Sequence, residues 1–333
     1  PPAAGQQAGM GGWASKPGWT AADAPDLSGR TAVVTGANTG LGLESARVLR
    51  ASGADVCIAC RDEAKMAGAL RQLRAEPSPP AGRVLGLQLD LSDLDSVRAF
   101  PAKLRAAGVD EVAYLLLNAG VMMPPERTLS KQGWEIQMAT NHLGHFALAN
   151  LLVPQLRAAA ESTGEPSRVV MVSSCAHQYS RPLDFRPGGF PAYESRYSAT
   201  GNYAQSKAAN LLHTHEYNAK LRQAGLDGLI EAVGCHPGVV ATDLQRHNKW
   251  ILHLVPLAQA VGLSHGVRAG ALPLVRACVD REGVSRGAYV GPSRNFAGPP
   301  EPMPQGSLFL SKLVAEDTAG AGPELWRGSA ART

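Results

Sequence analysis

The sequence lacks the patterns that mark disulfide-stapled, zinc-binding or nucleic-acid-binding proteins. Its five cysteines are an odd number in a chain of 333 residues, which argues against a disulfide framework and indicates a reducing compartment. The nine histidines include no HExxH pattern and no zinc-ligand spacing, so we expect no metal site. The net charge of +4 comes from scattered basic residues, which argues against a clustered nucleic-acid-binding surface.

Long hydrophobic runs are also missing. A membrane-spanning helix needs about 18 or more consecutive apolar residues. The best candidate, "WILHLVPLAQAVGL" at 250–263, is shorter and is interrupted by His253 and Pro256. Residues 1–27 begin with a glycine-, alanine- and proline-rich stretch without a signal-peptide pattern, so we expect a flexible tail. These absences predict a soluble intracellular protein without a transmembrane helix, in the cytosol or in an organelle such as the chloroplast.

One cysteine pair, Cys57 and Cys60, has the CxxC spacing of redox and metal sites. The pair lies in "ADVCIAC", which reads as a strand. Residues three apart in a strand point to opposite faces of the sheet. We therefore expect neither a bridge nor a shared metal ion.

The sequence does contain a regular alternation of strands and helices. Strands are predicted at 31–36, 54–60, 83–90, 112–120, 168–174, 229–238 and 287–291. Helices are predicted at 40–52, 62–75, 93–107, 131–160, 202–224 and 265–281. This order is typical of an α/β protein with a doubly wound parallel sheet, here as a single domain over 28–291.

The ends of two elements can be argued from single residues. Ser92 precedes the helix at 93–107 and is expected to cap it. Residues 292–307 are rich in proline, so we predict no ordered element there and treat 292–333 as an irregular C-terminal extension. One or two last helices are expected at 308–326.

A glycine-rich turn, "TGANTGLG", joins the first strand to the first helix. Its glycines, Gly36, Gly40 and Gly42, would let the backbone approach a pyrophosphate. The N-terminus of the following helix would present free N–H groups and a positive dipole end to the same group. The turn therefore predicts a dinucleotide site.

A tyrosine and a lysine stand four residues apart in "GNYAQSKAANLL" at 201–212. On a helix this spacing places Tyr203 and Lys207 on one face, one turn apart. A phenol has a pKa of about 10, which is high for acid–base work near neutrality. A neighbouring ammonium group would stabilise the phenolate and lower that pKa, so the pair indicates a proton donor and its electrostatic partner.

These motifs together resemble the short-chain dehydrogenase/reductase superfamily, with its Rossmann fold, over roughly residues 28 to 291. "TGANTGLG", "LDLSD", "NAG", "NHLGHF", the serine that closes the fifth strand, the YxxxK pair and "HPGVVATDL" follow in the family's order. The residues within these motifs are similar to those of the retinol-dehydrogenase-like branch. That branch is related to protochlorophyllide reductases and WW-domain oxidoreductases. An insert between Ser174 and Tyr203 is longer than in minimal members, which leaves the substrate open.

The resemblance implies a role for each matching residue. The implied catalytic residues are Asn141, Ser174, Tyr203 and Lys207, where Ser174 would hold the substrate oxygen and Asn141 a relay water. The implied cofactor contacts are Gly36, Asn38, Thr39, Gly40, Leu41, Gly42, Arg61, Asp90, Leu91, Asn118, Ala119, Gly120, Tyr203, Lys207, Pro237, Gly238 and Thr242. Ser173 is the rival for the serine role, but only one of two adjacent strand residues can face the site, and the family position is Ser174.

Cofactor choice follows from the end of the second strand. An acidic residue there would bind a ribose 2′-hydroxyl and repel a 2′-phosphate. The strand instead ends at Cys60 and is followed by Arg61, whose guanidinium can bind phosphate oxygens. Asp62 comes next, and it either opposes a phosphate at this position or only caps the following helix. The sequence therefore favours NADP(H).

The predicted function is an NADP(H)-dependent oxidoreductase that transfers a hydride between nicotinamide and a small apolar carbonyl or alcohol, with Tyr203 as acid and base.

The apolar segment in 240–263 is predicted to be a substrate lid, although a dimer face or a membrane-surface patch is an alternative. A second hypothesis is an enzyme that reduces a double bond, as protochlorophyllide reductases do. A third hypothesis, from a different class, is an NADPH-sensing subunit of a protein complex with little turnover. A homo-oligomer and a complex subunit both stay open.

Overall fold

A computed structural model describes residues 18–76, 82–180, 197–240, 264–293, 298–303 and 321–333. The predicted lid, Thr242 and most of the insert before Tyr203 lie outside the described residues. Within them, one eight-stranded sheet has the order β3-β2-β1-β4-β5-β6-β7-β8. The strands are β1 Thr31–Thr35, β2 Asp55–Cys60, β3 Val84–Gln88, β4 Tyr114–Leu117, β5 Ser167–Val172, β6 Ile230–Cys235, β7 Tyr289–Pro292 and β8 Pro300–Pro302.

All neighbouring strands pair in parallel except β7 and β8, which are antiparallel. The order reverses between β1 and β4, so the sheet is doubly wound, as predicted. β4, β5 and β6 are buried along their whole length, which is typical of parallel strands covered on both faces. The carboxyl ends of the strands at this switch point form the place where ligands bind in such sheets.

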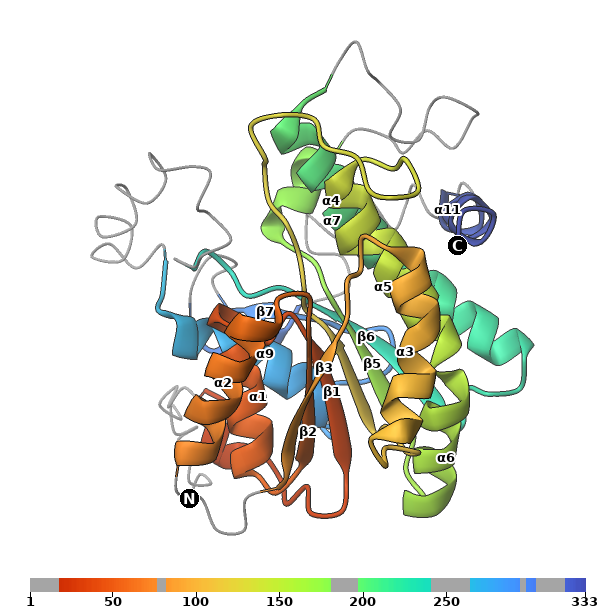
Figure 1. Ribbon diagram of the computed structural model, residues 1–333. Helices are drawn as coiled ribbons and strands as arrows, with labels where there is room; N and C mark the ends of the chain where they lie inside the picture. Colours follow the sequence, from red (N-terminus) through yellow and green to blue (C-terminus); the bar gives the residue numbers. More distant parts are fainter. Residues whose placement is uncertain (1–17, 77–81, 181–196, 241–263, 294–297, 304–320) are drawn as a thin grey trace, which may run out of the picture.

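Helices cover both faces of the sheet (Figure 1). One face carries α1 Gly40–Ala51, α2 Glu63–Ala75 and α9 Val267–Val279. The other carries α3 Leu94–Ala106, α5 Gly144–Leu151, α6 Val153–Thr163 and α7 Ala199–Gln223. Each layer buries its own apolar cluster against the strands. Short 3₁₀ turns occur at Ala21–Asp23 and Cys175–Tyr179.

The predicted cysteine geometry is confirmed. Cys57 is buried in the apolar cluster on the α3 and α7 side, and Cys60 in the cluster on the α1 and α9 side. Both thiols are free. The described residues contain no group of histidine, cysteine and acidic side chains that could hold a metal ion.

Several predicted element ends were wrong. The helix expected at 131–160 begins at Ile136 and is divided into α4 Ile136–Met138, a π-helical turn Ala139–Leu143, α5 and α6. The break before α6 has a physical cause, because Pro154 in its first turn has no N–H to donate. α7 begins at Ala199, where the Ser198 side chain accepts the Gly201 N–H at 3.1 Å.

The cap of α3 was also assigned to the wrong residue. Asp93, one position after the predicted Ser92, accepts the N–H of Asp95 and is the N-cap. The Ser92 hydroxyl instead donates to Asp90 Oδ1 at 2.6 Å. A carboxylate and a hydroxyl in adjacent positions compete for the same role, and the loop geometry decides between them.

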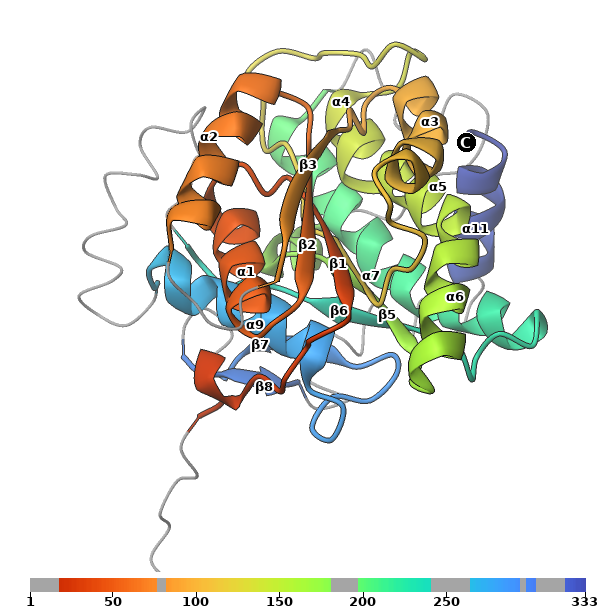
Figure 2. The ribbon, with the colours of Figure 1, turned by 60° about the horizontal axis from the view of Figure 1, so that its bottom comes forward.

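The C-terminal segment is more ordered than its composition indicates. β8 lies within the stretch predicted to have no ordered element, and it pairs with β7 at the edge of the sheet. Prolines are tolerated there because an edge strand has one side without ladder partners. The last described helix, α11 Ala321–Ala330, packs beside α5 and α7 (Figure 2), where the Trp326 ring lies 4.8 Å from the Phe146 ring.

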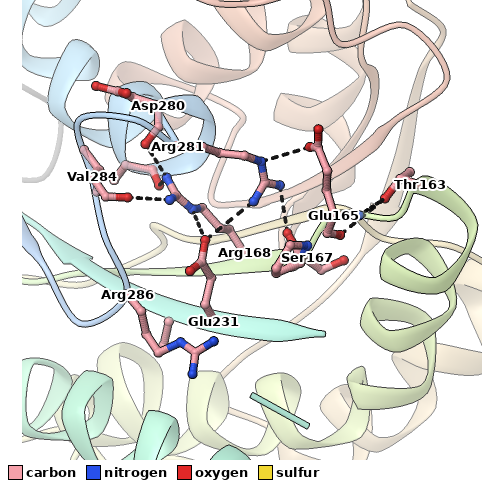
Figure 3. Close-up of polar contacts among 12 residues, drawn as sticks. Thr163, Glu165, Ser167, Arg168, Glu231, Asp280, Arg281, Val284 and Arg286 are labelled. Carbon is pink, nitrogen blue, oxygen red and sulfur yellow. Dashed lines mark hydrogen bonds and ion pairs between the residues drawn. The ribbon is translucent and has the colours of Figure 1, made fainter. Parts of the chain in front are cut away.

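A buried arginine joins β5, β6 and the end of α9 (Figure 3). Arg168 on β5 is 1% exposed, and its Nε donates to Oε1 of Glu231 on β6 at 2.6 Å. Its other nitrogens donate to the carbonyl oxygens of Ala277, Asp280 and Val284. Arg281 adds a second cation 3.5 Å from Glu231. Because these residues lie near the amino ends of β5 and β6, the cluster is at the edge of the sheet opposite the carboxyl ends.

Candidate active site

A cavity of about 730 Å³ lies at the carboxyl ends of the central strands. It is lined by the turn after β1, the loops after β2 to β6, and the first half of α7. Most of the residues predicted from sequence line it, namely Gly36, Asn38, Thr39, Gly40, Leu41, Gly42, Arg61, Asp90, Leu91, Asn118, Ala119, Gly120, Ser174, Tyr203, Lys207, Pro237 and Gly238. Asn141 lies behind the wall and is fully buried.

The glycine turn is packed too closely for side chains at two positions. Gly36 has a φ of +66°, and a Cβ there would lie 2.8 Å from the Ala119 Cα. A Cβ on Gly42 would lie 2.6 Å from the Gly36 carbonyl oxygen. The absence of side chains leaves the N-terminus of α1 open to the cavity, which is the arrangement that binds a pyrophosphate.

The loop after β4 is tied to the end of β1. Thr35 Oγ1 accepts the N–H groups of Asn118 and Ala119, each at 3.0 Å. The Asn118 side chain returns a hydrogen bond to the Thr35 carbonyl oxygen at 2.9 Å. These bonds fix the floor of the cavity between the glycine turn and α7.

Tyr203 and Lys207 lie one turn apart on α7 and both face the cavity. Lys207 Nζ lies 5.8 Å from the centre of the Tyr203 ring and donates to the Val172 carbonyl oxygen at 3.0 Å. Burial lowers the pKa of Lys207 to about 8. Burial raises the pKa of Tyr203, and the hydrogen bond with Ser174 acts in the opposite direction. The expected lowering of the Tyr203 pKa is therefore not found in the protein chain by itself, because desolvation outweighs the effect of neighbouring groups.

The two serines after β5 point to different places. The Ser173 hydroxyl donates to the Lys207 carbonyl oxygen at 2.8 Å and is buried. Ser174 is partly exposed in the cavity, accepts the Ala176 N–H at 3.2 Å and acts to lower the pKa of Tyr203. Only Ser174 can therefore present a free hydroxyl face to a ligand beside the Tyr203 phenol.

Asn141 lies in the π-helical turn, and its side-chain amide is hydrogen-bonded through both its oxygen and its nitrogen. Its Oδ1 accepts the Val121 N–H at 2.8 Å, and its Nδ2 donates to the Val121 carbonyl oxygen at 3.0 Å and to Ser206 Oγ at 2.9 Å. The amide therefore holds one wall of the cavity to α7.

Three kinds of cavity residue were missed by the sequence analysis. Lys65 on α2 lies in the wall with Arg61, and its position four residues after Arg61 was the available signal. Met122 and Met123 follow the "NAG" motif and give the cavity an apolar wall. Met123 has a φ of +48°, a left-handed conformation that is rare outside glycine. Cys175 also lines the cavity, and burial raises its thiol pKa.

Three buried histidines predict that the fold is sensitive to acid. Burial lowers the pKa values of His142, His145 and His236 to about 4, 3 and 3. In the unfolded chain a histidine has a pKa of about 6.5, so below that pH the unfolded state binds more protons and is favoured.

Between pH 7 and pH 5, the free energy of unfolding should fall by about 2 kcal/mol for each such histidine. Urea unfolding at the two pH values measures this difference. His142→Gln should reduce the difference in unfolding free energy between pH 7 and pH 5 by about 2 kcal/mol, the contribution of one histidine. An unfolding free energy that is the same at both pH values would refute the assignment.

Comparisons with known proteins show which family the chain belongs to. Residues 30–185 match the family model described as short chain dehydrogenase. The chain is 42% identical to the chloroplastic short-chain dehydrogenase TIC 32 B of Brassica napus, over 67% of this chain and 68% of that protein. It is 41% identical to human retinol dehydrogenase 12, over 67% of this chain and 65% of that protein.

Among solved structures, an uncharacterized protein from Mycobacterium paratuberculosis is 35% identical, with a TM-score of 0.72 over 95% of this chain and 97% of that one. No helix in the described residues is both long and apolar enough to cross a bilayer. The order of motifs, the doubly wound sheet and these similarities lead to one conclusion: the chain belongs to the short-chain dehydrogenase/reductase family, in its retinol-dehydrogenase-like branch, and is a short-chain oxidoreductase.

Proposed function

We propose that the protein uses NADPH to reduce apolar aldehydes or ketones and catalyses the reverse oxidation when NADP⁺ is abundant. The observation that carries this proposal is the meeting of Ser174, Tyr203 and Lys207 in a cavity that the glycine turn also lines. One part of the cavity fits a dinucleotide, and the other places an acid beside a hydroxyl group.

The chain's own residues would divide the work as follows. The turn at Gly36–Gly42 and the N-terminus of α1 bind the pyrophosphate. Lys207 binds the nicotinamide ribose, as the family resemblance implies, and its charge lowers the energy of the phenolate that forms on Tyr203. Ser174 orients the substrate oxygen, and the Tyr203 hydroxyl gives that oxygen its proton. When bound, the nicotinamide supplies the hydride.

Asn141 would act through its place in the π-helical turn. Because its amide is bonded to Val121 and Ser206, its side chain holds the wall beside Lys207 in position. A water on the Lys207 side of this turn would relay the proton to solvent, as the family resemblance implies.

Two cations support the choice of NADPH over NADH. Arg61 and Lys65 both line the cavity just beyond the end of β2. The Asp62 carboxylate, which could have repelled a phosphate, accepts the Lys65 N–H at 3.0 Å as the N-cap of α2. A 2′-phosphate would therefore meet the two positive side chains, and the Asp62 carboxylate, which also lines the cavity, would offset part of their charge.

The cofactor preference can be tested by substitution. Arg61→Ala and Lys65→Ala should each weaken NADPH binding by roughly 10- to 100-fold, since a hydrogen bond to a charged group contributes about 1.5–3 kcal/mol. NADH binding should change little, because it has no 2′-phosphate. Fluorescence titration of both cofactors measures the effect, with Arg71→Ala on the exposed face of α2 as the matched control. Equal affinities of the unchanged protein for NADPH and NADH would defeat the proposal.

The substrate end of the cavity is apolar. Met122, Met123, Val239 and Val240 line it, together with Cys175. Such a surface favours a hydrophobic carbonyl compound over a sugar or a charged acid. The function is tested by following NADPH absorbance against a panel of apolar aldehydes, ketones and quinones. Reduction of quinones alone would favour the double-bond reductase alternative over carbonyl reduction.

A further inference from the structure

A buried histidine connects the floor of the cavity to the π-helical turn. His145 on α5 is 2% exposed. Its Nε2 lies 2.9 Å from Thr35 Oγ1, and its Nδ1 lies 3.1 Å from the main-chain carbonyl oxygen of Asn141. Thr35 is the residue that holds the loop after β4, so one imidazole spans the two parts of the wall.

The hydrogen-bond partners of His145 determine which ring nitrogen carries the proton. The Asn141 carbonyl oxygen can only accept, so Nδ1 must carry the ring proton. Burial and the nearby charge of Lys207 lower the pKa of His145 to about 3, which keeps the ring neutral. Nε2 is therefore an acceptor, and it is the nearer of two acceptors for the Thr35 hydroxyl, at 2.9 Å against 3.3 Å for the Leu116 carbonyl oxygen.

The Thr35 hydroxyl is fully partnered as well. Its oxygen accepts two N–H groups, from Asn118 and Ala119, while its hydrogen has the imidazole and, at a longer distance, the Leu116 carbonyl oxygen as acceptors. His145 thus joins Thr35 to the π-helical turn through two buried hydrogen bonds. Fully connected buried networks of this kind hold a unique geometry, whereas partly satisfied ones do not.

We propose that His145 is a positioning residue for the reduction described above, and this proposal rests on that function. Through the Asn141 carbonyl it sets the position of the π-helical turn, and through Thr35 it ties that position to the loop under the cofactor. It touches neither the cavity nor its contents. Its effect on turnover passes through Asn141, whose amide holds Val121 in the wall beside Lys207.

The first test uses the unmodified protein and needs no substrate. Proton-detected ¹⁵N NMR of histidine-labelled protein, with His145 assigned from the spectrum of the His145→Gln variant, reports which ring nitrogen carries the proton. We expect a neutral ring with the proton on Nδ1 from pH 5 to pH 8. A proton on Nε2, or a ring that becomes charged in this range, would overturn the proposal whatever the enzyme reduces.

The second test separates positioning from stability. His145→Leu should lower kcat by roughly 10- to 100-fold, because small displacements of catalytic geometry have effects of that size. The NADPH dissociation constant should stay within about threefold of the wild type, since the glycine turn is untouched and the loop after β4 keeps its three hydrogen bonds to Thr35.

The matched control is His213→Leu. His213 is equally buried on α7, packs against the rings of Phe146 and Tyr217, and its Nε2 has no partner among the described residues. Its replacement should leave kcat near the wild-type value. An equal fall in kcat in both variants would overturn the proposal.

A double variant tests whether His145 acts through Asn141. If it does, His145→Leu should add little to the loss already caused by Asn141→Ala, because residues that act as a unit are not additive. Losses that multiply would show that the two residues act independently and would contradict the proposal. A wild-type protein that reduces nothing in the panel, together with the expected NMR result, would instead count against the proposed function alone.

Discussion

Replacing Tyr203 with phenylalanine is expected to abolish most of the turnover while NADPH still binds. The change removes one oxygen from a side chain that is 5% exposed and keeps its ring in place. The proton donor is then lost, and general acid catalysis contributes roughly 10²- to 10⁴-fold to rate. The pyrophosphate and phosphate contacts are made by other residues, so the dissociation constant for NADPH should change little. Steady-state kinetics and fluorescence titration measure the two quantities.

The chain offers a matched control on the same helix. Tyr217 is buried on α7 and its hydroxyl donates to the Ala149 carbonyl oxygen at 3.0 Å. Tyr217→Phe also removes one buried hydroxyl, but far from Ser174, and should leave kcat near the wild-type value. Lys207→Ala, in contrast, should impair both NADPH binding and turnover. Full activity of Tyr203→Phe on an identified substrate would show that another group supplies the proton.

Removing the buried arginine should cause the largest loss of stability. Arg168→Met takes away a cation that Glu231 faces within the protein and leaves that carboxylate without its closest partner. Breaking a buried ion pair on one side typically costs about 3–5 kcal/mol. Three main-chain carbonyl groups also lose a donor, so the junction of β5, β6 and α9 should loosen. Urea unfolding measures the loss.

The surface pair of Arg157 and Glu161 on α6 provides the comparison. Both side chains are about half exposed, and Arg157 Nε lies 2.6 Å from Glu161 Oε1. Arg157→Met should therefore lower the free energy of unfolding by less than about 1 kcal/mol. Arg168→Met combined with Glu231→Leu should recover part of the stability, because the lone charge is then gone. A loss after Arg168→Met no larger than that after Arg157→Met would contradict this account of the cluster.

Much of the fold and of the cavity could be predicted because the signals are local. Apolar strands alternate with helices at short range, and the turn at Gly36–Gly42 carries its own steric reason for glycine. Helical spacing was enough to place Tyr203 and Lys207 on one face. Strand alternation was the wrong reason for separating Ser173 from Ser174, because β5 ends at Val172 and both serines follow it.

What could not be predicted depends on contacts between distant parts of the chain. Apolar spacing does not encode a π-helical turn, so the position of Asn141 with its amide bonded to Val121 could not be foreseen. The docking of Trp326 beside α7 joins residues far apart in sequence. The burial of Tyr203, which raises the pKa of its phenol in the protein chain by itself, becomes known only from the fold.

The central claim is that hydride passes from NADPH to a carbonyl carbon while Tyr203 supplies the proton. The most direct measurement uses NADPH deuterated on either face of C4 and an aldehyde or ketone that the protein reduces. Mass spectrometry of the product alcohol should find deuterium on the carbinol carbon from one of the two faces only. The same transfer should be absent or strongly slowed with Tyr203→Phe and unaffected by Tyr217→Phe. Consumption of NADPH without deuterium on the carbinol carbon, or equal transfer by the Tyr203→Phe variant, would contradict the account.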